Sequence, residues 1–571
     1  MKSSKKTVKP VARLNQTNLA ARGEPALWTM GGTLVLGVLM IVSFLILIVW
    51  NGITTFYPGK IETVILADSS LVAGEQRRSE TYKPTKEVVD SLDRKDRERI
   101  VENNGFAKRT LYKIGNYDLY NEDFKWVDEF EIKQKSEPED IMYFERVEWG
   151  PFIGFIEKVE FGDQTRLPGT GLQELLKDQH QKAVARRSAI GEIEKKKISD
   201  INYDLEEERL NLKKAELNNG LNSAKFLKVK QIYETKVSAL KARYHTLQAE
   251  AEKLKQENSQ YRLTLKDISG QQKDLLLSDI VRFYRANDLS LFQKLGIYFS
   301  RWAEFLSAEP REANTEGGVM PAIFGTLTMT LLLVIAVAPF GVVAALYLRE
   351  YAKQGYLVSI VRICVNNLAG VPSIVYGVFG LGFFAYTIGG SIDALFYSEK
   401  LPNPTFGTGG LLWASLTLAL LTVPVVIVAT EEALAAVPQS LREGSLACGA
   451  SKWQTIKNIV VPKALPGILT GLILAMARGA GEVAPLMLVG VVKMAPELPF
   501  DGHFPFVHLE RSFMHLGFHI FDVGFQSRNA EAGKPMVFVT TLLLIFLVAM
   551  MNAVAIFIRN RLNRRFSAGH F

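Results

Sequence analysis

The sequence predicts a mostly α-helical membrane protein with six transmembrane helices and a soluble insert, which holds a small α/β domain and an antiparallel coiled-coil hairpin. Strongly apolar stretches occupy residues 28–50 and recur from 319 to 558, whereas the interval between them is highly charged. A membrane span needs about 20 apolar helical residues, and these stretches can supply six. Within the charged interval, apolar residues recur at alternating spacings of four and three, which is typical of paired helices.

The first predicted span is residues 28–50. It is too long for the apolar part of a secretory signal, and no small-residue cleavage site follows it. Basic residues that flank spans stay in the cytoplasm, so we expect residues 1–27 and the tail 559–571 to be cytoplasmic. An even number of spans follows, and the net charge of +8 is explained without nucleic-acid binding. The flanking basic residues are Lys2, Lys5, Lys6, Lys9, Arg13 and Arg22, then Arg559, Arg561, Arg564 and Arg565.

The interval between the first two spans is too long to be a connector, and we expect it to lie in the periplasm. Its first part, residues 51–171, is predicted to be a small mixed α/β domain, with helical spacing in residues 84–104. Both cysteines, Cys364 and Cys448, fall in the membrane half, so the insert folds without disulfides. The runs with the alternation of strands are 61–66, 124–127 and 143–161.

Residues 172–270 are predicted to form the coiled-coil hairpin, and residues 271–318 to return the chain to the membrane. A turn signal, Asn218-Asn219-Gly220, separates the two arms. This favours a hairpin that folds on itself, with pairing between two chains as the alternative. The seam positions are Ile198, Ile201, Leu205, Glu208, Leu212 and Ala215 in the first arm, and Val237, Leu240, Tyr244, Leu247, Ala251, Leu254, Asn258, Tyr261, Leu265 and Ile268 in the second.

Residues 319–558 are predicted to form a five-helix core. A polar cytoplasmic segment, 431–463, interrupts it, and residues 493–535 form an exterior loop. Gly370, Pro372 and Gly377 are expected to break the third span within the bilayer, where irregular backbone survives only next to protein or water. The expected spans are 319–348, 356–385, 410–430, 464–492 and 536–558.

The segment 431–463 predicts a short helix–glycine–helix knob below the bilayer. Pro438 stands near the start of its first helix, and the run from Ser440 to Glu443 has the spacing of a capping box. Gly449 is a plausible end for this helix, and a short amphipathic piece leads to Pro462 and the next span. Such a knob suits insertion into a groove on a partner protein.

The knob resembles the EAA loop of binding-protein-dependent ABC importer permeases. That loop has Glu-Ala-Ala, three residues, Gly, nine residues, Ile, one residue and Leu-Pro. This chain departs in having Gly-Ser for Ala-Ala and Val461 for Leu. The resemblance implies that the loop docks onto a cytoplasmic ATPase. The matching positions are Glu443, Gly444, Ser445, Gly449, Ile459 and Pro462.

Blocks at residues 317–333, 366–380 and 466–488 make the resemblance narrower, because they are similar to the PstA-type permeases of phosphate importers. The similarity covers residues 317–560 and leaves the insert outside. It implies the type I importer permease fold and an inner-membrane location. It also implies a second, PstC-like permease subunit, two copies of a PstB-like ATPase and a periplasmic phosphate-binding protein as partners.

Arg478 and Glu482 lie four residues apart in the fifth predicted span. Charges deep in a membrane are costly and usually face a cavity or each other, so Arg478 could offer a positive site to an oxyanion, oriented by Glu482. The PstA resemblance also places a translocation-linked arginine in this segment. An internal salt bridge that only locks helices is the alternative. Gly467, Gly471 and Gly479 have the spacing of a helix-packing face, which we expect to contact the partner permease.

No segment of the chain has the Gly-x-x-x-x-Gly-Lys-Ser/Thr pattern of a P-loop, and a nucleophile elbow and an HExxH motif are also missing. We therefore expect no enzyme activity, no cofactor bound by this chain, and ATP hydrolysis by a separate subunit. His503, His508, His515 and His519 cluster in the exterior loop, but no Cys or acidic pattern completes a metal site. The alternative functions are import of another oxyanion, such as sulfate or molybdate, and a membrane-anchored periplasmic scaffold or sensor.

Overall fold

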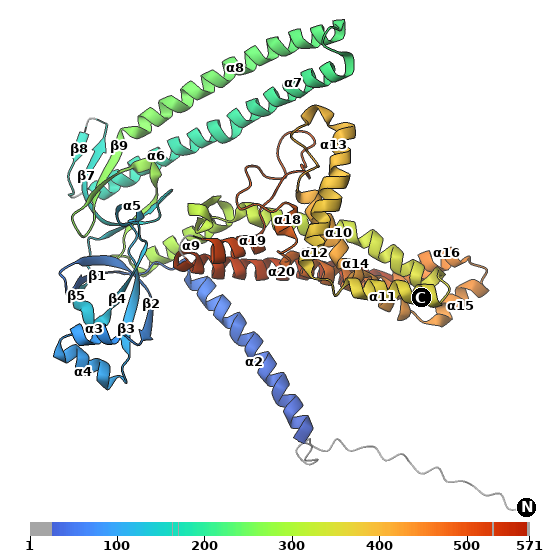
Figure 1. The fold of residues 1–571 in the computed structure, drawn as a ribbon, viewed down its shortest axis with the longest axis horizontal. Coiled ribbons are helices and arrows are strands. Elements are labelled where there is room, and N and C mark those ends of the chain that lie inside the picture. Colours follow the sequence, from blue (N-terminus) through green and yellow to red (C-terminus); the bar gives the residue numbers. More distant parts are fainter. Residues whose placement is uncertain (1–24, 163, 170, 528–529, 568–571) are drawn as a thin grey trace, which may run out of the picture.

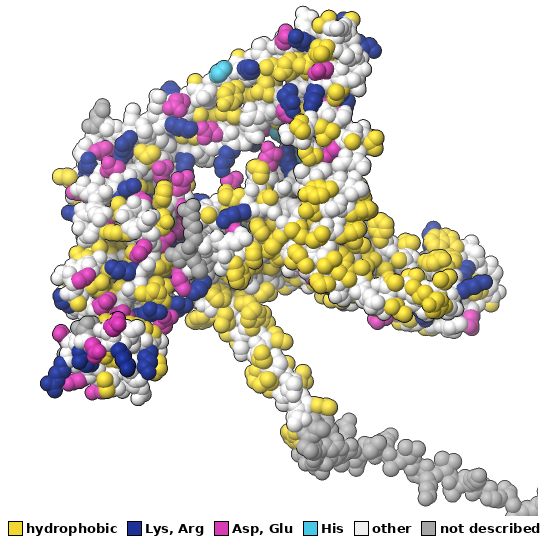
Figure 2. Space-filling view, viewed as in Figure 1, with side chains coloured by type: hydrophobic (Ala, Val, Ile, Leu, Met, Phe, Trp, Pro, Cys, Tyr) yellow, Lys and Arg dark blue, Asp and Glu magenta, His cyan; other side chains and the backbone are white. Residues whose placement is uncertain are grey.

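The computed structural model describes residues 25–162, 164–169, 171–527 and 530–567. The basic residues of the N-terminal segment up to Arg22 lie outside the described residues. Long helices form a core, and the insert lies at one end of it (Figure 1). Hydrophobic side chains cover the core and the first span, whereas charged side chains gather on the insert (Figure 2).

Within the described residues, six helices are long and apolar enough to cross a membrane, which confirms the predicted number. The first, α2 (Pro25–Thr54), is exposed along most of its length and packs on the last helix near its own end. Gly52, for example, lies against Leu542 there. The six spans are Trp28–Thr54, Met320–Tyr351, Ser373–Phe396, Leu411–Ala435, Lys452–Gly481 and Glu531–Arg564.

The helix at the centre of the core is α14 (Leu411–Ala435), which packs between α10 (Met320–Leu346) and α17 (Val461–Gly481). Buried threonines satisfy their hydroxyls within their own helices. Thr330 donates to the carbonyl of Thr326, and Thr417 to that of Trp413. This local bonding suits helices in lipid. A polar group that has no hydrogen-bond partner there costs a free energy on the order of several kcal/mol. The last helix, α20 (Ala530–Ser567), closes the core.

The expected break in the third span is confirmed near Gly370 and Pro372, whereas Gly377 lies inside a helix. The span itself is Ser373–Phe396, so the predicted bounds 356–385 are wrong. The chain forms α11 (Tyr356–Leu368), leaves the helix, and continues through α12 (Ser373–Phe379), a π-helix η6 (Gly380–Gly389) and α13 (Gly390–Phe396). Pro372 causes the interruption, because it disfavours helical backbone in the preceding residue. Tyr376 bridges the break by donating to the carbonyl of Leu368 at 2.6 Å.

The fifth span also differs from the predicted 464–492. It begins at Lys452, as α16 (Lys452–Thr455) and the π-helix η8 (Ile456–Val460) run into α17, and it ends at Gly481. Beyond it, α18 (Leu486–Val489) is one short helix that follows Pro485. The exterior loop contains α19 (Leu516–Phe521) and the π-helix η9 (Asp522–Gln526).

The first part of the insert is an antiparallel sheet in the order β4-β3-β2-β1-β5. Two short helices, α3 (Lys86–Ser91) and α4 (Arg94–Glu102), join β2 and β3. Val64, Tyr112 and Val127 form its buried side. The strands are β1 (Ile61–Leu66), β2 (Leu71–Tyr82), β3 (Ala107–Lys113), β4 (Phe124–Asp128) and β5 (Ile132–Ser136).

A second antiparallel sheet has the order β10-β9-β7-β6-β11, with β8 on β7. It joins strands from both sides of the hairpin, since Val159 of β7 is opposite Leu263 of β9. The expected return segment, 271–318, therefore contributes two strands and is not a simple connector. The strands are β6 (Met142–Arg146), β7 (Phe152–Phe161), β8 (Gln164–Arg166), β9 (Tyr261–Lys266), β10 (Gln272–Leu276) and β11 (Ile280–Arg285).

The hairpin consists of α6 (Leu172–Gly191), a π-helix η2 (Glu192–Lys197), α7 (Ile198–Asn219) and α8 (Ala224–Ser259). Figure 1 shows α7 and α8 side by side as a long arm. The predicted boundary at residue 270 is wrong, because α8 ends at Ser259 and Tyr261 and Leu265 belong to strand β9. Asn258 is buried at the base, where its carbonyl oxygen accepts from Arg186 Nε at 2.6 Å.

Candidate functional site

The EAA-like loop, residues 431–463, lies at the end of the core opposite the insert (Figure 1). Helix α14 ends at Ala435, α15 spans Gln439–Ala447, and α16 begins after Ser451. Gly449 has φ of 84°, a left-handed conformation that glycine adopts without strain. The amide of Ala450 donates to the carbonyl of Ser445 at 3.2 Å, so α15 ends in a Schellman motif. The segment therefore has the helix–glycine–helix form.

The predicted capping box at Ser440 is wrong. Pro438 is the N-cap of α15, and Ser440 lies inside the first turn. A capping box occurs one helix later, where the hydroxyl of Ser451 accepts from the amide of Gln454 at 3.3 Å. In return, the side chain of Gln454 accepts from the amide of Ser451 at 2.8 Å. This box begins the long helix that carries the fifth span.

The inner side of the loop is fixed to the core. Arg442 donates to the carbonyls of Val437 at 2.6 Å and Leu434 at 2.7 Å, and it pairs with Glu350 at 2.9 Å. The hydroxyls of Ser445 and Thr455 are 2.9 Å apart and join α15 to α16. Movement of α15 is therefore linked to the π-helix η5 (Tyr347–Tyr351), which follows α10 and carries Glu350. Beneath these contacts lies an apolar cluster of Leu434, Val437, Val460, Ala464 and Ile468.

The outer side of the loop is exposed and partly apolar. Leu446 is 49% exposed and Trp453 58% exposed. A methyl group added at Gly444 would meet no atom within 4 Å. Of the sequence-predicted positions, Glu443, Gly444 and Gly449 are exposed, whereas Ser445, Ile459 and Pro462 are half-buried. Large exposed apolar side chains beside open backbone are typical of a contact surface.

Arg478 lies in the last turn of α17, and Glu482 directly follows that helix. The Arg478 Nε and the Glu482 Oε1 are 3.6 Å apart, and the two side chains are 37% and 24% exposed. The prediction that Glu482 lies within the fifth span is corrected, because α17 ends at Gly481 and Glu482 has extended backbone. At a helix C-terminus a cation complements the helix dipole. Within the described residues Glu482 is the only ion-pair partner of Arg478, so most of the guanidinium's donors remain available.

The small-residue face of α17 packs within this chain, and its expected contact with a partner permease is corrected. A methyl group at Gly467 would lie 2.5 Å from the Cβ of Ala433 in α14, and one at Gly471 would lie 2.6 Å from the Cβ of Ala429. Gly479 lies against Leu333 of α10. These glycines let three helices approach closely around α14, as small residues do in membrane bundles.

The histidines of the exterior loop are placed in two different environments. His508 pairs with Asp501 at 3.0 Å, and His503 lies 3.5 Å from Asp200 of α7. Burial lowers the pKa of His515 and that of His519 to about 4, so both are neutral at pH 7. In the part of the chain that the structure describes, no group of three His, Cys, Asp or Glu side chains is placed to hold a metal ion.

Two features of the site have no signal in the sequence. Arg362 pairs with Glu431 at 3.4 Å, and Arg442 with Glu350, across separations of 69 and 92 residues. Single charged residues near span ends give no indication of their partner. The hairpin also reaches the core, since Lys213 of α7 donates to the carbonyl of Leu401 at 2.6 Å.

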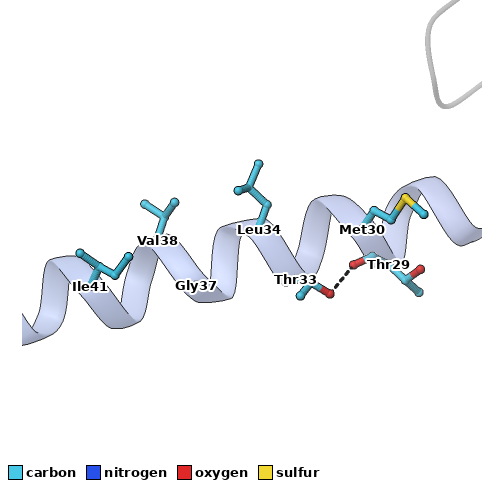
Figure 3. Close-up of a pocket in the computed structure, with 7 residues that line it drawn as sticks. All are labelled: Thr29, Met30, Thr33, Leu34, Gly37, Val38 and Ile41. Carbon is cyan, nitrogen blue, oxygen red and sulfur yellow. Dashed lines mark hydrogen bonds between the residues drawn. The ribbon is translucent and has the colours of Figure 1, made fainter. Parts of the chain in front are cut away.

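A shallow groove follows α2 and is lined by residues of that one helix (Figure 3). It holds no charged side chain, so it does not suit an anion. Its lining residues are Thr29, Met30, Thr33, Leu34, Gly37, Val38 and Ile41.

Comparison with known proteins finds relatives of the core. Residues 337–568 match the family described as binding-protein-dependent transport system inner membrane component. A probable ABC transporter permease protein, YqgH of Bacillus subtilis (strain 168), is 34% identical over 224 residues, which are 39% of this chain and 68% of that protein. The phosphate transport system permease protein PstA of Mycobacterium leprae (strain TN) is 37% identical over 220 residues, 38% of this chain and 66% of that protein.

Among solved structures, the chain is similar to one of the MetNI methionine ABC transporter in an inward-facing conformation. The identity is 19% and the TM-score 0.31, and the match covers 43% of this chain and 94% of the other. The family match begins inside α10, so the insert lies outside it.

Proposed function

Because this chain belongs to the family of binding-protein-dependent transport system inner membrane components, we propose that it is the permease subunit forming half of the translocation pathway of an ATP-driven phosphate importer. The relatives named as phosphate permeases support this substrate. The structural observation that carries it is Arg478, a cation at the end of a core helix whose only ion-pair partner among the described residues is Glu482.

The chemistry of this pair suits phosphate. Guanidinium groups bind oxyanions through several parallel hydrogen bonds, and Arg478 is partly exposed. Glu482 lies 3.6 Å away, beyond a normal hydrogen bond, so an arriving anion does not have to displace a tight ion pair. The hydroxyl group of a monoprotonated phosphate can donate a hydrogen bond to the Glu482 carboxylate. Fully ionised sulfate has no such proton and meets only repulsion there, which gives a physical basis for selectivity.

The EAA-like loop couples this pathway to ATP. Its exposed side, with Leu446 and Trp453, is the docking surface for a cytoplasmic ATPase, and Arg442 passes the movement to Glu350 in η5, the π-helix that follows α10. The partners in this proposal are two PstB-like ATPase copies, a PstC-like second permease and a periplasmic phosphate-binding protein. ATP is bound by the ATPase subunits, and this chain holds no cofactor.

The proposal fixes a topology in the bacterial inner membrane. Both termini and the EAA-like loop lie in the cytoplasm, and the insert lies in the periplasm. An even number of spans within the described residues supports this arrangement. So do the opposite positions of the insert and the loop on the core (Figure 1).

The test is uptake of radiolabelled phosphate by cells that carry Arg478→Ala, with Arg478→Lys as the matched variant that keeps the charge. We expect Arg478→Ala to abolish phosphate uptake, while the variant subunit still co-purifies with its ATPase and sulfate uptake is unchanged. Partial uptake with Arg478→Lys would show that charge and geometry both matter.

Three results would contradict parts of the proposal. Normal phosphate uptake by Arg478→Ala removes this residue from the pathway. If Arg478→Ala abolished sulfate or molybdate uptake and left phosphate uptake intact, the permease would be assigned to another oxyanion. Deletion of the whole chain without any transport defect would favour a periplasmic scaffold or sensor.

A further inference from the structure

Helix α9 (Leu291–Ser307) joins the insert to the second span, and one of its sides is uncovered. The side chains on that side are apolar; the first two are adjacent, and the others follow at spacings of three, four and seven residues. None of them is charged. Their exposed fractions are 63% for Leu291, 86% for Phe292, 37% for Leu295, 63% for Phe299 and 43% for Leu306. A capping box between Ser290 and Gln293 fixes where the helix begins.

A second side of α9 packs against the residues that follow the first span, α2, and those that precede the second span, α10. Trp302 and Phe305 contact the ring of Phe56, just beyond the end of α2, with centroids 5.2 and 5.3 Å apart. The ring centroids of Tyr298 and Tyr57 are 6.5 Å apart. Phe305 is also buried in the same cluster as Val319, directly before α10. The helix is therefore held at the level where α2 ends and α10 begins.

The third side of α9 carries charges that hold the insert. Arg301 donates to Glu145 of β6 at 2.8 Å, and Glu304 pairs with Arg282 of β11 at 3.0 Å. Arg282 also pairs with Glu145. Burial by itself would raise the pKa of Glu145, but Arg301 and Arg282 outweigh it and hold that pKa below its ordinary value. The second sheet is thus fixed to α9 by a largely buried ion-pair network.

We propose that the uncovered side of α9 lies in the outer interface of the lipid bilayer, so that α9 anchors the insert to the membrane surface. A helix with one broad apolar side and a polar opposite side binds in the headgroup region, with its apolar side chains near the acyl chains. Trp302, Tyr298 and Tyr57 are the residue types enriched at that depth. The partner is lipid, because α9 packs where α2 ends and α10 begins, and the five side chains of its uncovered side are all apolar.

The ion pairs give this anchor a consequence for the insert. Since Arg301 and Glu304 are on the same helix as Phe299 and Leu306, the depth of α9 sets the height of the second sheet above the membrane. The hairpin grows from that sheet, so its position over the core loops depends on the anchor. This inference goes beyond phosphate transport and would hold for any substrate.

The test uses the complete complex in phosphatidylcholine–phosphatidylglycerol vesicles. Cys364→Ser and Cys448→Ser remove the native thiols, and an environment-sensitive fluorophore is placed at Phe299→Cys or at Leu306→Cys. The matched control is Ser307→Cys, which is also exposed but lies about 100° further round the helix than Leu306. Quenching is measured with lipids spin-labelled near the headgroup and with iodide in the water.

We expect the labels at 299 and 306 to be quenched several-fold more by the shallow lipid label than the label at 307, and several-fold less by iodide. Strong iodide quenching at 299 would place this side in water and overturn the proposal. Protection from both quenchers would show that a protein partner covers α9, which also overturns it. Phosphate uptake by the same variants is recorded separately, so neither result depends on the assigned substrate.

Discussion

The membrane core and the insert bury polar groups in different ways. In the core, buried threonines such as Thr330 and Thr417 donate to carbonyls four residues back in their own helix. In the insert, Glu145 and Arg146 are buried against charged partners from distant parts of the chain, Arg301 and Asp118. These buried polar groups of the core are therefore satisfied within their own helices, and those of the insert by partners far away in the chain. The two regions should respond to different substitutions.

The largest expected effect is in the insert. Arg301→Ala removes one of the two arginines that pair with the buried Glu145, so the free energy of unfolding of the insert should fall by about 3–5 kcal/mol. Urea unfolding of the purified complex, followed by protease cleavage within the insert, measures this. The control is Arg285→Ala, whose exposed pair with Asp288 is 3.8 Å long and should contribute about 0–1 kcal/mol. Equal effects of the two variants would contradict the role of the buried pairs.

A smaller effect is expected where helices of the core touch. Gly471→Ala would bring a methyl group 2.6 Å from the Cβ of Ala429, and such overpacking costs about 1–3 kcal/mol. Gly481→Ala is the matched control on the same helix, since a methyl group there meets nothing within 4 Å. Thermal unfolding of the detergent-solubilised complex should show a lower midpoint only for Gly471→Ala. If both variants lowered the midpoint, the thermal stability of the core would not depend specifically on the contact between α17 and α14.

The smallest effect is expected from the distal part of the hairpin. Removing residues 200–249, with a short glycine link, deletes the contacts of Tyr203 with Phe504 and of Lys213 with Leu401. Exposed contacts of this kind contribute about 0–1 kcal/mol each, so phosphate uptake should stay close to the wild-type rate. Lys213→Ala in the full hairpin is the control for a single contact. If the truncated chain assembled but transported nothing, the hairpin would belong to the pathway.

The same contrast explains how much could be predicted from the sequence. Spans in the core depend on apolar length, and six of them could be predicted without any knowledge of contacts. The site residues Arg478 and Glu482 could be paired because they are four apart. The end of α17, which lies between these two residues, could not be predicted. Glu482 is flanked by apolar residues in the sequence, and its distance of four residues from Arg478 is the spacing that a continuous helix would have.

The insert was harder to predict, because its sheets depend on strands that are far apart in the chain. Tyr261 and Leu265 continue the four–three spacing of α8, yet they form β9, because pairing with β7 satisfies their backbone. Pairing across about 100 residues leaves no local signal. The capping box is a different case, since Ser440 and Ser451 both have the spacing. Only Ser451 is the residue directly before a helix, whereas Ser440 lies inside a helix that already begins after Pro438.

The central claim is that the EAA-like loop docks on an ATPase, and the chain supplies its own probe for it. Cys448 is exposed and directly precedes Gly449. In a Cys364→Ser background, a short bifunctional thiol–amine reagent should crosslink Cys448 to the ATPase subunit in the assembled complex, and Cys448→Ser should abolish the product. A complex that assembles without this product, or labelling of Cys448 by a membrane-impermeant reagent from outside the inner membrane, would contradict the account.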